Sequence, residues 1–304
     1  MGETLKFPRW IQLGNGKMRD EMTDKVVMVT GATDGIGLIT ARELAAMGAR
    51  VLLVGRNKQK GAASLAAIRA KVPKADLAFF RADLSSQTEI LKLSGTVQET
   101  EPKLDVLVNN AGGIFLNRQE SPDGIELTFA LNHLNYFLLT LQMLDLLREA
   151  PAARVVNVAS RAHVGATLDF EDLEFRSAYS AQNAYRRSKL CNIMFTRALA
   201  RRLEGSRITT NALHPGFVRT AFGGAGNPLY FRLAVRAAML TMGIGVEEGA
   251  RTSIYLASSP QVEGVSGKYF AKSAETTPTK AARDDEAGER LWQISEQMVS
   301  NASA

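Results

Sequence analysis

Short runs of β-branched and other apolar residues alternate with segments of helical periodicity along most of the chain, and this alternation limits the folds that it can adopt. Strands are expected at seven segments: 25–30, 49–55, 75–84, 104–112, 153–160, 207–216 and 268–271. The first of these, KVVMVT, suits a strand buried on both faces. The alternation therefore predicts an α/β fold with a doubly wound, mostly parallel sheet of about seven strands and helices on both faces.

Nothing in the sequence divides the chain into two domains. Its 304 residues, 45% of them apolar, suffice for one large domain with a sizeable core. We expect residues 1–23 to form an N-terminal arm laid on a single domain at 24–304. That domain would include a C-terminal helix in which three apolar residues recur at i, i+3 and i+7: Leu291, Ile294 and Met298.

Charge and cysteine content exclude several classes of function. The formal net charge is +6, but Lys and Arg are spread along the chain without a basic block, so we expect no nucleic-acid partner. The single cysteine, Cys191, allows no disulfide framework, and His163 and His214 lack the further ligands that a metal site needs. Two arginines interrupt the apolar segment 229–245, so we expect no membrane span and a cytoplasmic protein.

The glycine-rich stretch TGATDGIG lies between the first strand and the first helix. There Gly31, Gly35 and Gly37 would permit a tight turn, a close approach of backbone to ligand, and close helix packing. A pyrophosphate would meet the amides at the helix N-terminus. This context indicates a nucleotide site, and the alternative is a βα turn that binds nothing.

Arg56 follows the second strand, where an NAD site usually has an acidic residue that binds the ribose hydroxyls. A carboxylate there would repel a 2′-phosphate, whereas a guanidinium can bind one through two hydrogen bonds. Arg56 therefore favours NADP(H), while NAD(H) remains open. The alternative is an exposed arginine at the start of a helix.

Tyr185 and Lys189 are four residues apart in AYRRSKLCN and would share one face of a helix. Taken alone, this spacing is typical of any surface helix. Tyr179 is a rival for a functional role, but the residue four positions further on is Asn183, so it has no lysine partner. His133 is expected to be packed in the helix rather than catalytic.

Six motifs in this order, TGATDGIG, NNAG, LNHL, VVNVAS, AYRRSK and HPGFVRT, resemble the short-chain dehydrogenase/reductase superfamily, whose fold is Rossmann-like. The resemblance covers about residues 24–272. Arg56, LNHLNYFLLT, SKLCNIMFTRALARRL and the long gap before Tyr185 look like the branch of retinol dehydrogenases and related carbonyl reductases.

The resemblance implies roles for particular residues. The catalytic residues would be Asn132, Ser160, Tyr185 and Lys189. The cofactor would contact Gly31, Asp34, Gly35, Ile36, Gly37, Arg56, Asn57, Asp83, Leu84, Asn110, Ala111, Gly112, Tyr185, Lys189, Pro215, Gly216, Val218 and Thr220. Two features depart from the usual pattern: Asp34 stands where several NADP-preferring relatives have a basic residue, and Ser160 lies 25 positions before Tyr185.

These side chains suit a carbonyl reduction, which needs a hydride on carbon and a proton on oxygen. A nearby ammonium would lower the pKa of the Tyr185 phenol, which is ordinarily near 10. Ser160 would hydrogen-bond the substrate oxygen, and Asn132 would hold a water that links Lys189 to solvent. The cofactor would supply the hydride.

We therefore expect an NADP(H)-dependent oxidoreductase that interconverts a hydrophobic aldehyde or ketone and its alcohol. The apolar segment 219–246 would form the substrate lid. The alternatives are an NAD-linked alcohol dehydrogenase and a non-catalytic nucleotide-binding regulator. Pairing of two copies through the long helices is left open.

Overall fold

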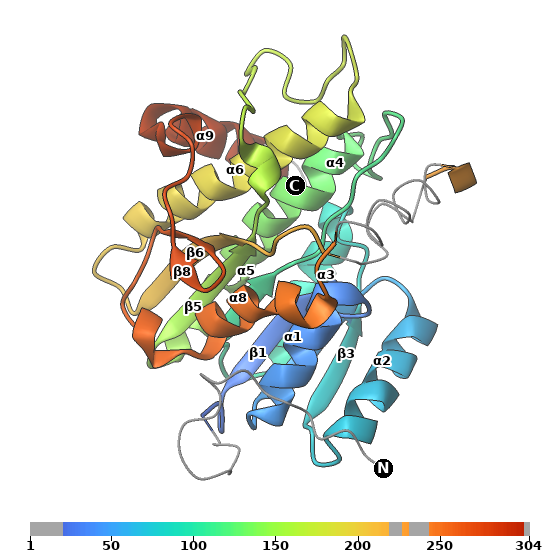
Figure 1. Cartoon of the computed structure of the whole chain (residues 1–304), viewed down its shortest axis with the longest axis vertical. Helices are drawn as coiled ribbons and strands as arrows, with labels where there is room; N and C mark the ends of the chain where they lie inside the picture. The colour runs from blue at the N-terminus through green and yellow to red at the C-terminus, as the bar shows by residue number, and fades with distance from the viewer. Residues whose placement is uncertain (1–20, 219–226, 231–242, 301–304) are drawn as a thin grey trace.

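A single sheet of eight strands forms the centre of the molecule (Figure 1). The structure is a computed structural model, and it describes residues 21–218, 227–230 and 243–300. The strand order is β3-β2-β1-β4-β5-β6-β7-β8, with β1 at Val26–Thr30, β2 at Arg50–Gly55, β3 at Leu77–Arg81, β4 at Val106–Asn109, β5 at Ala153–Val158, β6 at Ile208–His214, β7 at Tyr269–Ala271 and β8 at Ala274–Glu275. The seven expected strands pair in parallel, and the two-residue β8 is an antiparallel addition.

The strand order reverses between β1 and β4. From β1 the chain proceeds outward through β2 to β3, and it then returns to the other side of β1 with β4. In such a sheet the crevice outside the carboxyl ends of the strands is the usual ligand site, and it lies at the point of reversal. The ends of β1 and β4, at Thr30 and Asn109, therefore position the site.

Helices cover both faces of the sheet. They are α1 (Gly35–Ala46), α2 (Lys58–Lys71), α3 (Gln87–Thr100), α4 (Leu127–Phe129), α5 (Asn135–Glu149), α6 (Ala181–Arg202), α8 (Val246–Ser258) and α9 (Asp285–Ser300). Alternate residues of β1 serve two cores: Met28 packs with residues of α3, α5 and α6, whereas Val27 and Val29 pack with residues of α1 and α8. Both faces are therefore apolar, as the unbroken apolar runs predict.

The helical segment before β5 is divided into three pieces. A short α4 is followed by a π-helical turn at Ala130–Leu134, and only then does α5 begin. The carboxylate of Glu126 caps the start by accepting hydrogen bonds from the amides of Thr128 at 2.8 Å and Phe129 at 2.7 Å. A π-helical turn inside a helix is often found at a functional position.

The C-terminal helix α9 packs on α6, as the spacing of its apolar residues predicts. Leu291 is buried, and Ile294 and Met298 are partly buried against the same core. Trp292 is also buried, and the Arg202 guanidinium of α6 lies 3.8 Å from the centre of its ring. The helix therefore caps the domain.

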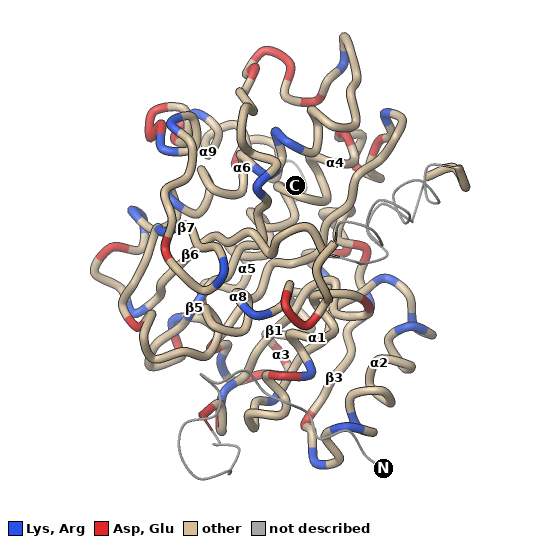
Figure 2. The backbone as a smooth tube through the Cα atoms, in the orientation of Figure 1, with Lys and Arg blue, Asp and Glu red and all other residues tan. Residues whose placement is uncertain are grey.

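Charged side chains of both signs are interspersed over the described chain (Figure 2). Among the described residues, no helix is long and apolar enough to span a bilayer. The proposed arm at 1–23, apart from its last three residues, lies outside the described residues. So does most of the proposed lid, including Thr220, because only 227–230 and 243–246 of it are described.

Candidate active site

The glycine-rich turn joins β1 to α1 in a backbone conformation that would suit a ligand bound by main-chain amides. Gly31 and Gly35 have φ angles of 64° and 53°, which favour glycine because other side chains are strained there. A Cβ on Gly37 would lie 2.4 Å from the carbonyl oxygen of Gly31 and 2.5 Å from Asn110 Nδ2. The turn and the helix therefore pack at a distance that only glycine allows, and the residues present fit a dinucleotide.

A hydrogen-bond network joins the end of β4 to the end of β1. Thr30 Oγ1 accepts from the amides of Asn110 at 2.8 Å and Ala111 at 3.0 Å, and it donates to Val108 O at 3.3 Å. Asn110 Nδ2 donates to Thr30 O at 2.8 Å. This network places Ala111 and Gly112 beside the glycine turn.

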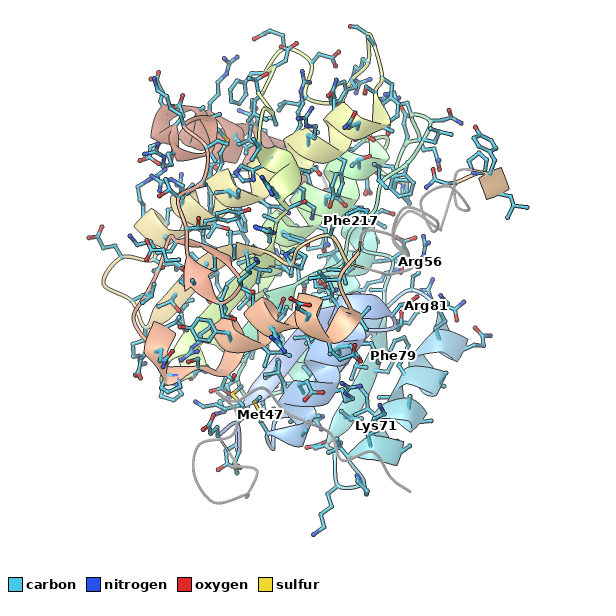
Figure 3. All side chains as sticks on the ribbon, viewed as in Figure 1. Met47, Arg56, Lys71, Phe79, Arg81 and Phe217 are labelled. Carbon is cyan, nitrogen blue, oxygen red and sulfur yellow. The ribbon has the colours of Figure 1, made fainter. Side chains whose placement is uncertain are left out.

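Arg56 lies at the carboxyl end of β2, just before the Asn57 cap of α2 (Figure 3). Its side chain is exposed and has no hydrogen bond or ion pair with any described residue, whereas the neighbouring Arg81 pairs with Glu89 at 3.1 Å. The start of α2 is fixed by Asn57, which accepts from Lys60 N at 2.9 Å. Arg56 is thus available to a ligand.

Asp34 and Asp83 lie at two further positions of the expected cofactor site. Asp34 caps α1, and its carboxylate also lies 4.0 Å from Lys60 Nζ, so a cation offsets its charge. Asp83 follows β3 and accepts hydrogen bonds from the amide of Ser85 at 3.0 Å and from its hydroxyl at 2.7 Å. Leu84 beside it is buried, and Ile36 is partly buried at the start of α1.

Asn132 lies in the π-helical turn and is fully buried. Its Oδ1 accepts from Gly113 N at 2.8 Å, and its Nδ2 donates to Gly113 O at 2.9 Å and to Ser188 Oγ at 3.0 Å. A Cβ on Gly112 would lie 3.0 Å from Asn132 Oδ1 and 3.6 Å from Lys189 Nζ. The loop after β4 therefore brings the cofactor end and the lysine helix together.

Ser160 and Tyr185 are in side-chain contact despite the long gap between them. Ser160 begins a short 3₁₀ turn at Arg161–His163, and its hydroxyl accepts from Ala162 N at 3.1 Å. The Ser160 side chain also lies against the Tyr185 phenol, where it favours the anion and so acts to lower the pKa of the phenol. Burial has the larger effect and raises the pKa of Tyr185 to about 12.

Lys189 lies one turn after Tyr185 on α6 and is buried. Its Nζ donates to Val158 O at 2.9 Å and lies 5.7 Å from the centre of the Tyr185 ring. Burial lowers the pKa of Lys189 to about 7. Tyr185 and Lys189 therefore lie together as expected. The pKa of Tyr185, however, is raised rather than lowered by the protein groups alone, because burial has the largest effect on it.

The nicotinamide-side turn follows β6. Gly216 has a φ of 93°, and its amide donates to His214 Nδ1 at 3.1 Å. Pro215 is partly buried and Val218 is buried, where it forms a parallel bridge with Ile244. Of the residues expected here, Thr220 is the one outside the described range.

Two rival residues have structural partners instead. Tyr179 donates its hydroxyl to Phe115 O at 2.8 Å and contacts Thr128 Oγ1 at 3.4 Å. His133 is buried among aromatic rings with its Nε2 2.8 Å from Ser295 Oγ, and burial lowers its pKa to about 3. The expectation that His133 is packed is confirmed. Among the described residues, no group of acidic, cysteine and histidine side chains could hold a metal.

Comparison with known proteins identifies the family. Residues 25–228 match the family model described as short chain dehydrogenase. The chain belongs to the short-chain dehydrogenase family. It is 39% identical over 306 residues to human (Homo sapiens) retinol dehydrogenase 14, covering 96% of this chain and 91% of the relative, so it belongs to the retinol dehydrogenase-like branch.

Two solved structures share the fold. An uncharacterized protein from Mycobacterium Paratuberculosis superposes with a TM-score of 0.73 at 30% identity, covering 91% of this chain and 94% of that one. A single-site variant of actinorhodin polyketide ketoreductase with NADPH superposes with a TM-score of 0.63 at 26% identity, covering 83% of this chain and 95% of that one. This short-chain dehydrogenase thus shares its fold with a known ketoreductase.

Two residues of the site were not expected from the sequence. Thr30 joins β1 to β4, and Ser188 joins Asn132 to α6 by accepting from its amide at 3.0 Å and donating to Tyr185 O at 2.8 Å. Ser188 directly precedes Lys189, so a polar residue inside the tyrosine–lysine motif was a usable signal. Thr30 offered none, because a threonine that ends a strand is ordinary.

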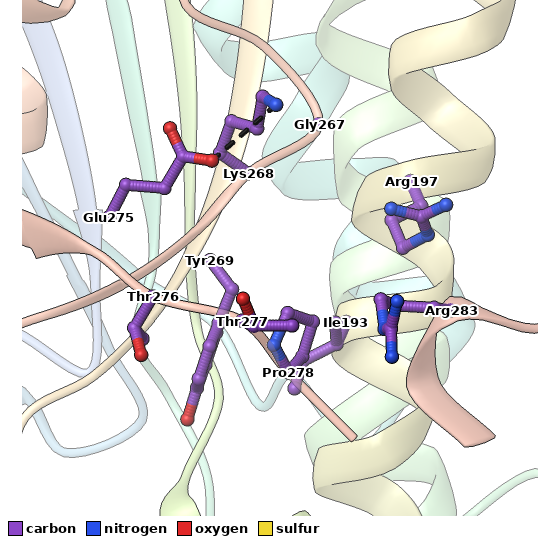
Figure 4. Close-up of a pocket in the computed structure, with 10 residues that line it drawn as sticks. All are labelled: Ile193, Arg197, Gly267, Lys268, Tyr269, Glu275, Thr276, Thr277, Pro278 and Arg283. Carbon is purple, nitrogen blue, oxygen red and sulfur yellow. Dashed lines mark ion pairs between the residues drawn. The ribbon is translucent and has the colours of Figure 1, made fainter. Parts of the chain in front are cut away.

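A pocket of about 160 Å³ lies elsewhere in this short-chain dehydrogenase (Figure 4). It is lined by residues of α6, of β7 and β8, and of the segment before α9: Ile193, Arg197, Gly267, Lys268, Tyr269, Glu275, Thr276, Thr277, Pro278 and Arg283. None of the four expected catalytic residues lines it. We do not assign the chemistry to this pocket, because the paired Tyr185 and Ser160 lie outside it.

Proposed function

We propose that this protein is an NADP(H)-dependent oxidoreductase that interconverts a hydrophobic aldehyde or ketone and its alcohol. The observation that carries the proposal is the assembly of Ser160, Tyr185 and Lys189, with Gly112 of the loop after β4 next to Lys189 Nζ. A nucleotide-binding regulator would have no need of this cluster. Catalysis therefore explains the arrangement best.

The side chains divide the proton chemistry among them, while bound NADP(H) supplies or accepts the hydride. Ser160 would hydrogen-bond the carbonyl oxygen, and the adjacent Tyr185 phenol would donate its proton to that oxygen. With a pKa of about 7, Lys189 can gain and lose a proton at neutral pH. Its replacement proton would arrive through a water held near Asn132.

Arg56 supports NADP(H) over NAD(H). It is exposed and unpaired among the described residues at the end of β2, where its guanidinium can bind a 2′-phosphate. Asp34 does not oppose this, because Lys60 offsets its charge. The ketoreductase neighbour is described with NADPH, which agrees with the proposal.

A hydrophobic substrate is supported by the relatives and by the described rim of the site. The relative retinol dehydrogenase 14 is named for a hydrophobic alcohol. Phe217, next to the nicotinamide-side turn, is 48% exposed. Leu229 and Tyr230 are also exposed, and Asn227 fixes that segment to the loop after β4 by donating to Ile114 O at 2.7 Å. An apolar molecule would cover such side chains.

The cofactor is tested by fluorescence titration of the purified protein with NADPH and NADH. Wild type should prefer NADPH, and Arg56→Asp should lose that preference by at least about tenfold in Kd because a bidentate charged contact is replaced by repulsion. Lys71→Asp is the matched control, since it makes the same charge change at the far end of α2 (Figure 3). Equal binding of both cofactors by wild type would favour the NAD-linked alternative.

Turnover is tested with a panel of lipophilic aldehydes and ketones against sugars of similar carbonyl reactivity. We expect NADPH oxidation with the lipophilic compounds and little with the sugars. NADPH binding without turnover of any carbonyl or alcohol would instead support the regulatory alternative.

A further inference from the structure

His163 is held at both ring nitrogens beside the catalytic serine. It ends the 3₁₀ turn that Ser160 begins, and only 2% of its surface is exposed. Its Nδ1 lies 2.8 Å from Ser160 O, and the amide of Thr279 donates to its Nε2 at 3.4 Å. The turn that carries the catalytic hydroxyl is thus joined to a segment more than a hundred residues further along the chain.

These partners determine the tautomer of His163. A carbonyl oxygen can only accept, so Nδ1 carries the hydrogen and donates to Ser160 O. An amide N–H can only donate, so Nε2 is unprotonated and accepts from Thr279. Both ring nitrogens are then satisfied only in the neutral Nδ1–H form, and burial lowers the pKa of His163 in agreement with that form.

The segment that Thr279 belongs to is anchored to α6. We call residues 276–284 the C-terminal strap. Thr279 Oγ1 accepts from Ala282 N at 3.3 Å within it, and Asp285 directly after it pairs with Arg197 at 3.0 Å and Arg201 at 2.6 Å on α6. The strap therefore bridges α6, which carries Tyr185, and the turn that carries Ser160.

Other ionisable groups surround the ring without replacing its two bonds. The Tyr269 ring of β7 packs edge-on to His163 at 5.2 Å, and His214 of β6 lies 6.0 Å from the same tyrosine. Arg161 and Lys272 also act on His214 electrostatically. Burial of the ring disfavours the charged form of His163, which keeps the bridge neutral.

We propose that His163 is a positioning residue that fixes the Ser160 hydroxyl for catalysis by tying its turn to the C-terminal strap. The inference rests on the proposed function, because it assumes that Ser160 contacts the substrate oxygen. Small displacements of such a group reduce the rate, since catalysis depends on near-attack geometry. The residue acts through Ser160 and does not itself touch the substrate.

Two substitutions separate the two bonds. In His163→Asn the amide nitrogen can replace Nδ1 and keep the bond to Ser160, whereas the bond to Thr279 is lost. In His163→Gln the amide oxygen can replace Nε2 and keep the bond to Thr279, whereas the bond to Ser160 is lost. We expect kcat to fall about threefold in His163→Asn and about tenfold or more in His163→Gln, with Kd for NADPH unchanged, because the direct bond to the serine turn matters most.

A double-mutant cycle shows whether the loss passes through Ser160. Each His163 substitution should reduce kcat in wild type and have no further effect in a Ser160→Ala background. A histidine that merely stabilises the fold would reduce activity equally in both backgrounds and in proportion to its loss of thermal stability. That additive result, or equal losses in the Asn and Gln variants, would overturn the proposal.

Hydrogen exchange of the Ala162 amide tests the same proposal without turnover. This amide donates to Ser160 Oγ, so its protection reports the position of the hydroxyl. It should exchange faster in His163→Gln than in wild type, with His163→Asn between them. Unchanged exchange in His163→Gln would count against the positioning role. If wild type reduces no carbonyl, the proposed function fails while this measurement still decides the position of Ser160.

Discussion

The Tyr185 phenol illustrates how burial and catalysis compete at one residue. Desolvation raises its pKa to about 12, while the Ser160 side chain favours its anion. Carbonyl reduction would need the phenol in its protonated form, and a raised pKa keeps the phenol protonated at neutral pH. The buried Lys189 nearby can restore that proton.

Tyr185→Phe removes the proton donor and leaves the ring. We expect kcat for carbonyl reduction to fall about 10²- to 10⁴-fold, with Kd for NADPH within a factor of about three of wild type. Stopped-flow reduction and a fluorescence titration measure the two quantities. Retention of more than a tenth of the wild-type kcat would show that another group protonates the substrate.

His133 should make the protein sensitive to acid. Ser295 Oγ donates to Leu291 O, so His133 Nε2 must carry the hydrogen that bonds Ser295. Burial keeps the ring neutral. Its pKa is about 3 when folded and ordinarily near 6.5, so below pH 6.5 the unfolded chain binds the proton first. The free energy of unfolding should therefore fall by about 2 kcal/mol between pH 7 and pH 5 from this residue alone.

Urea unfolding at pH 7 and pH 5 checks this expectation. His133→Gln removes the ionisable ring and retains a donor for Ser295, so its loss of stability over the same pH interval should be smaller by about that amount. An identical pH dependence in wild type and variant would mean that other groups cause the acid sensitivity.

The motifs indicated which residues lie together at the candidate site, and their catalytic roles stay a prediction, but the motifs did not indicate the electrostatics of these residues. Ser160 was assigned through VVNVAS, and its contact with Tyr185 is present in the structure. The predicted lowering of the Tyr185 pKa is wrong for the protein groups alone, since helical spacing does not reveal that Lys189 donates to Val158 O. The bridge that His163 forms between the Ser160 turn and Thr279 could not be predicted either, because Thr279 is distant in the sequence.

At the scale of elements, the glycine turn and α1 form one unit. A methyl group on Gly37 would collide with Gly31 O, which belongs to the backbone and cannot move aside cheaply. Gly37→Ala should therefore raise Kd for NADPH more than about tenfold and lower the melting temperature, because the helix must move away from the turn.

Gly95→Ala on α3 is the matched control for that substitution. No atom lies within 4 Å of a Cβ at Gly95, so alanine should stabilise the protein by about 0.5–1 kcal/mol through its better helix propensity and leave NADPH binding unchanged. Thermal melts and titrations of both variants give the comparison. Equal effects of the two substitutions would contradict the close packing of α1.

Strands were easier to predict than the division of the helix before β5. The apolar runs lie within two or three residues of the observed strands because burial on both faces leaves a strong local pattern. The π-helical turn at Ala130–Leu134 has no such pattern, since Asn132 bonds there to Gly113, nineteen residues away. The short β8 depends likewise on its neighbour β7 rather than on its own two residues.

Across the whole molecule, the two halves of the sheet carry different parts of the candidate site. The strands β1 to β3 and their helices present the cofactor end, while β5 and α6 present Ser160 and Tyr185. The contacts of Thr30 with Asn110 and of Asn132 with Gly113 and Ser188 join these halves. Under the proposed function, the distance between the cofactor and Tyr185 would therefore be set by the backbone and these side-chain amides rather than by surface loops.

The buried thiol of Cys191 provides a way to observe how often that arrangement opens. It lies on α6, two residues after Lys189, with none of its surface exposed, and burial raises its pKa to about 12. A thiol reagent should therefore react only after α6 separates from the core, far more slowly than with a free cysteine, and saturating NADPH should slow the reaction further because it binds only the closed form. Labelling at the rate of a free thiol would show that α6 is not held as described. Because the chain has a single cysteine, one absorbance trace records the opening frequency of the helix that carries both Tyr185 and Lys189.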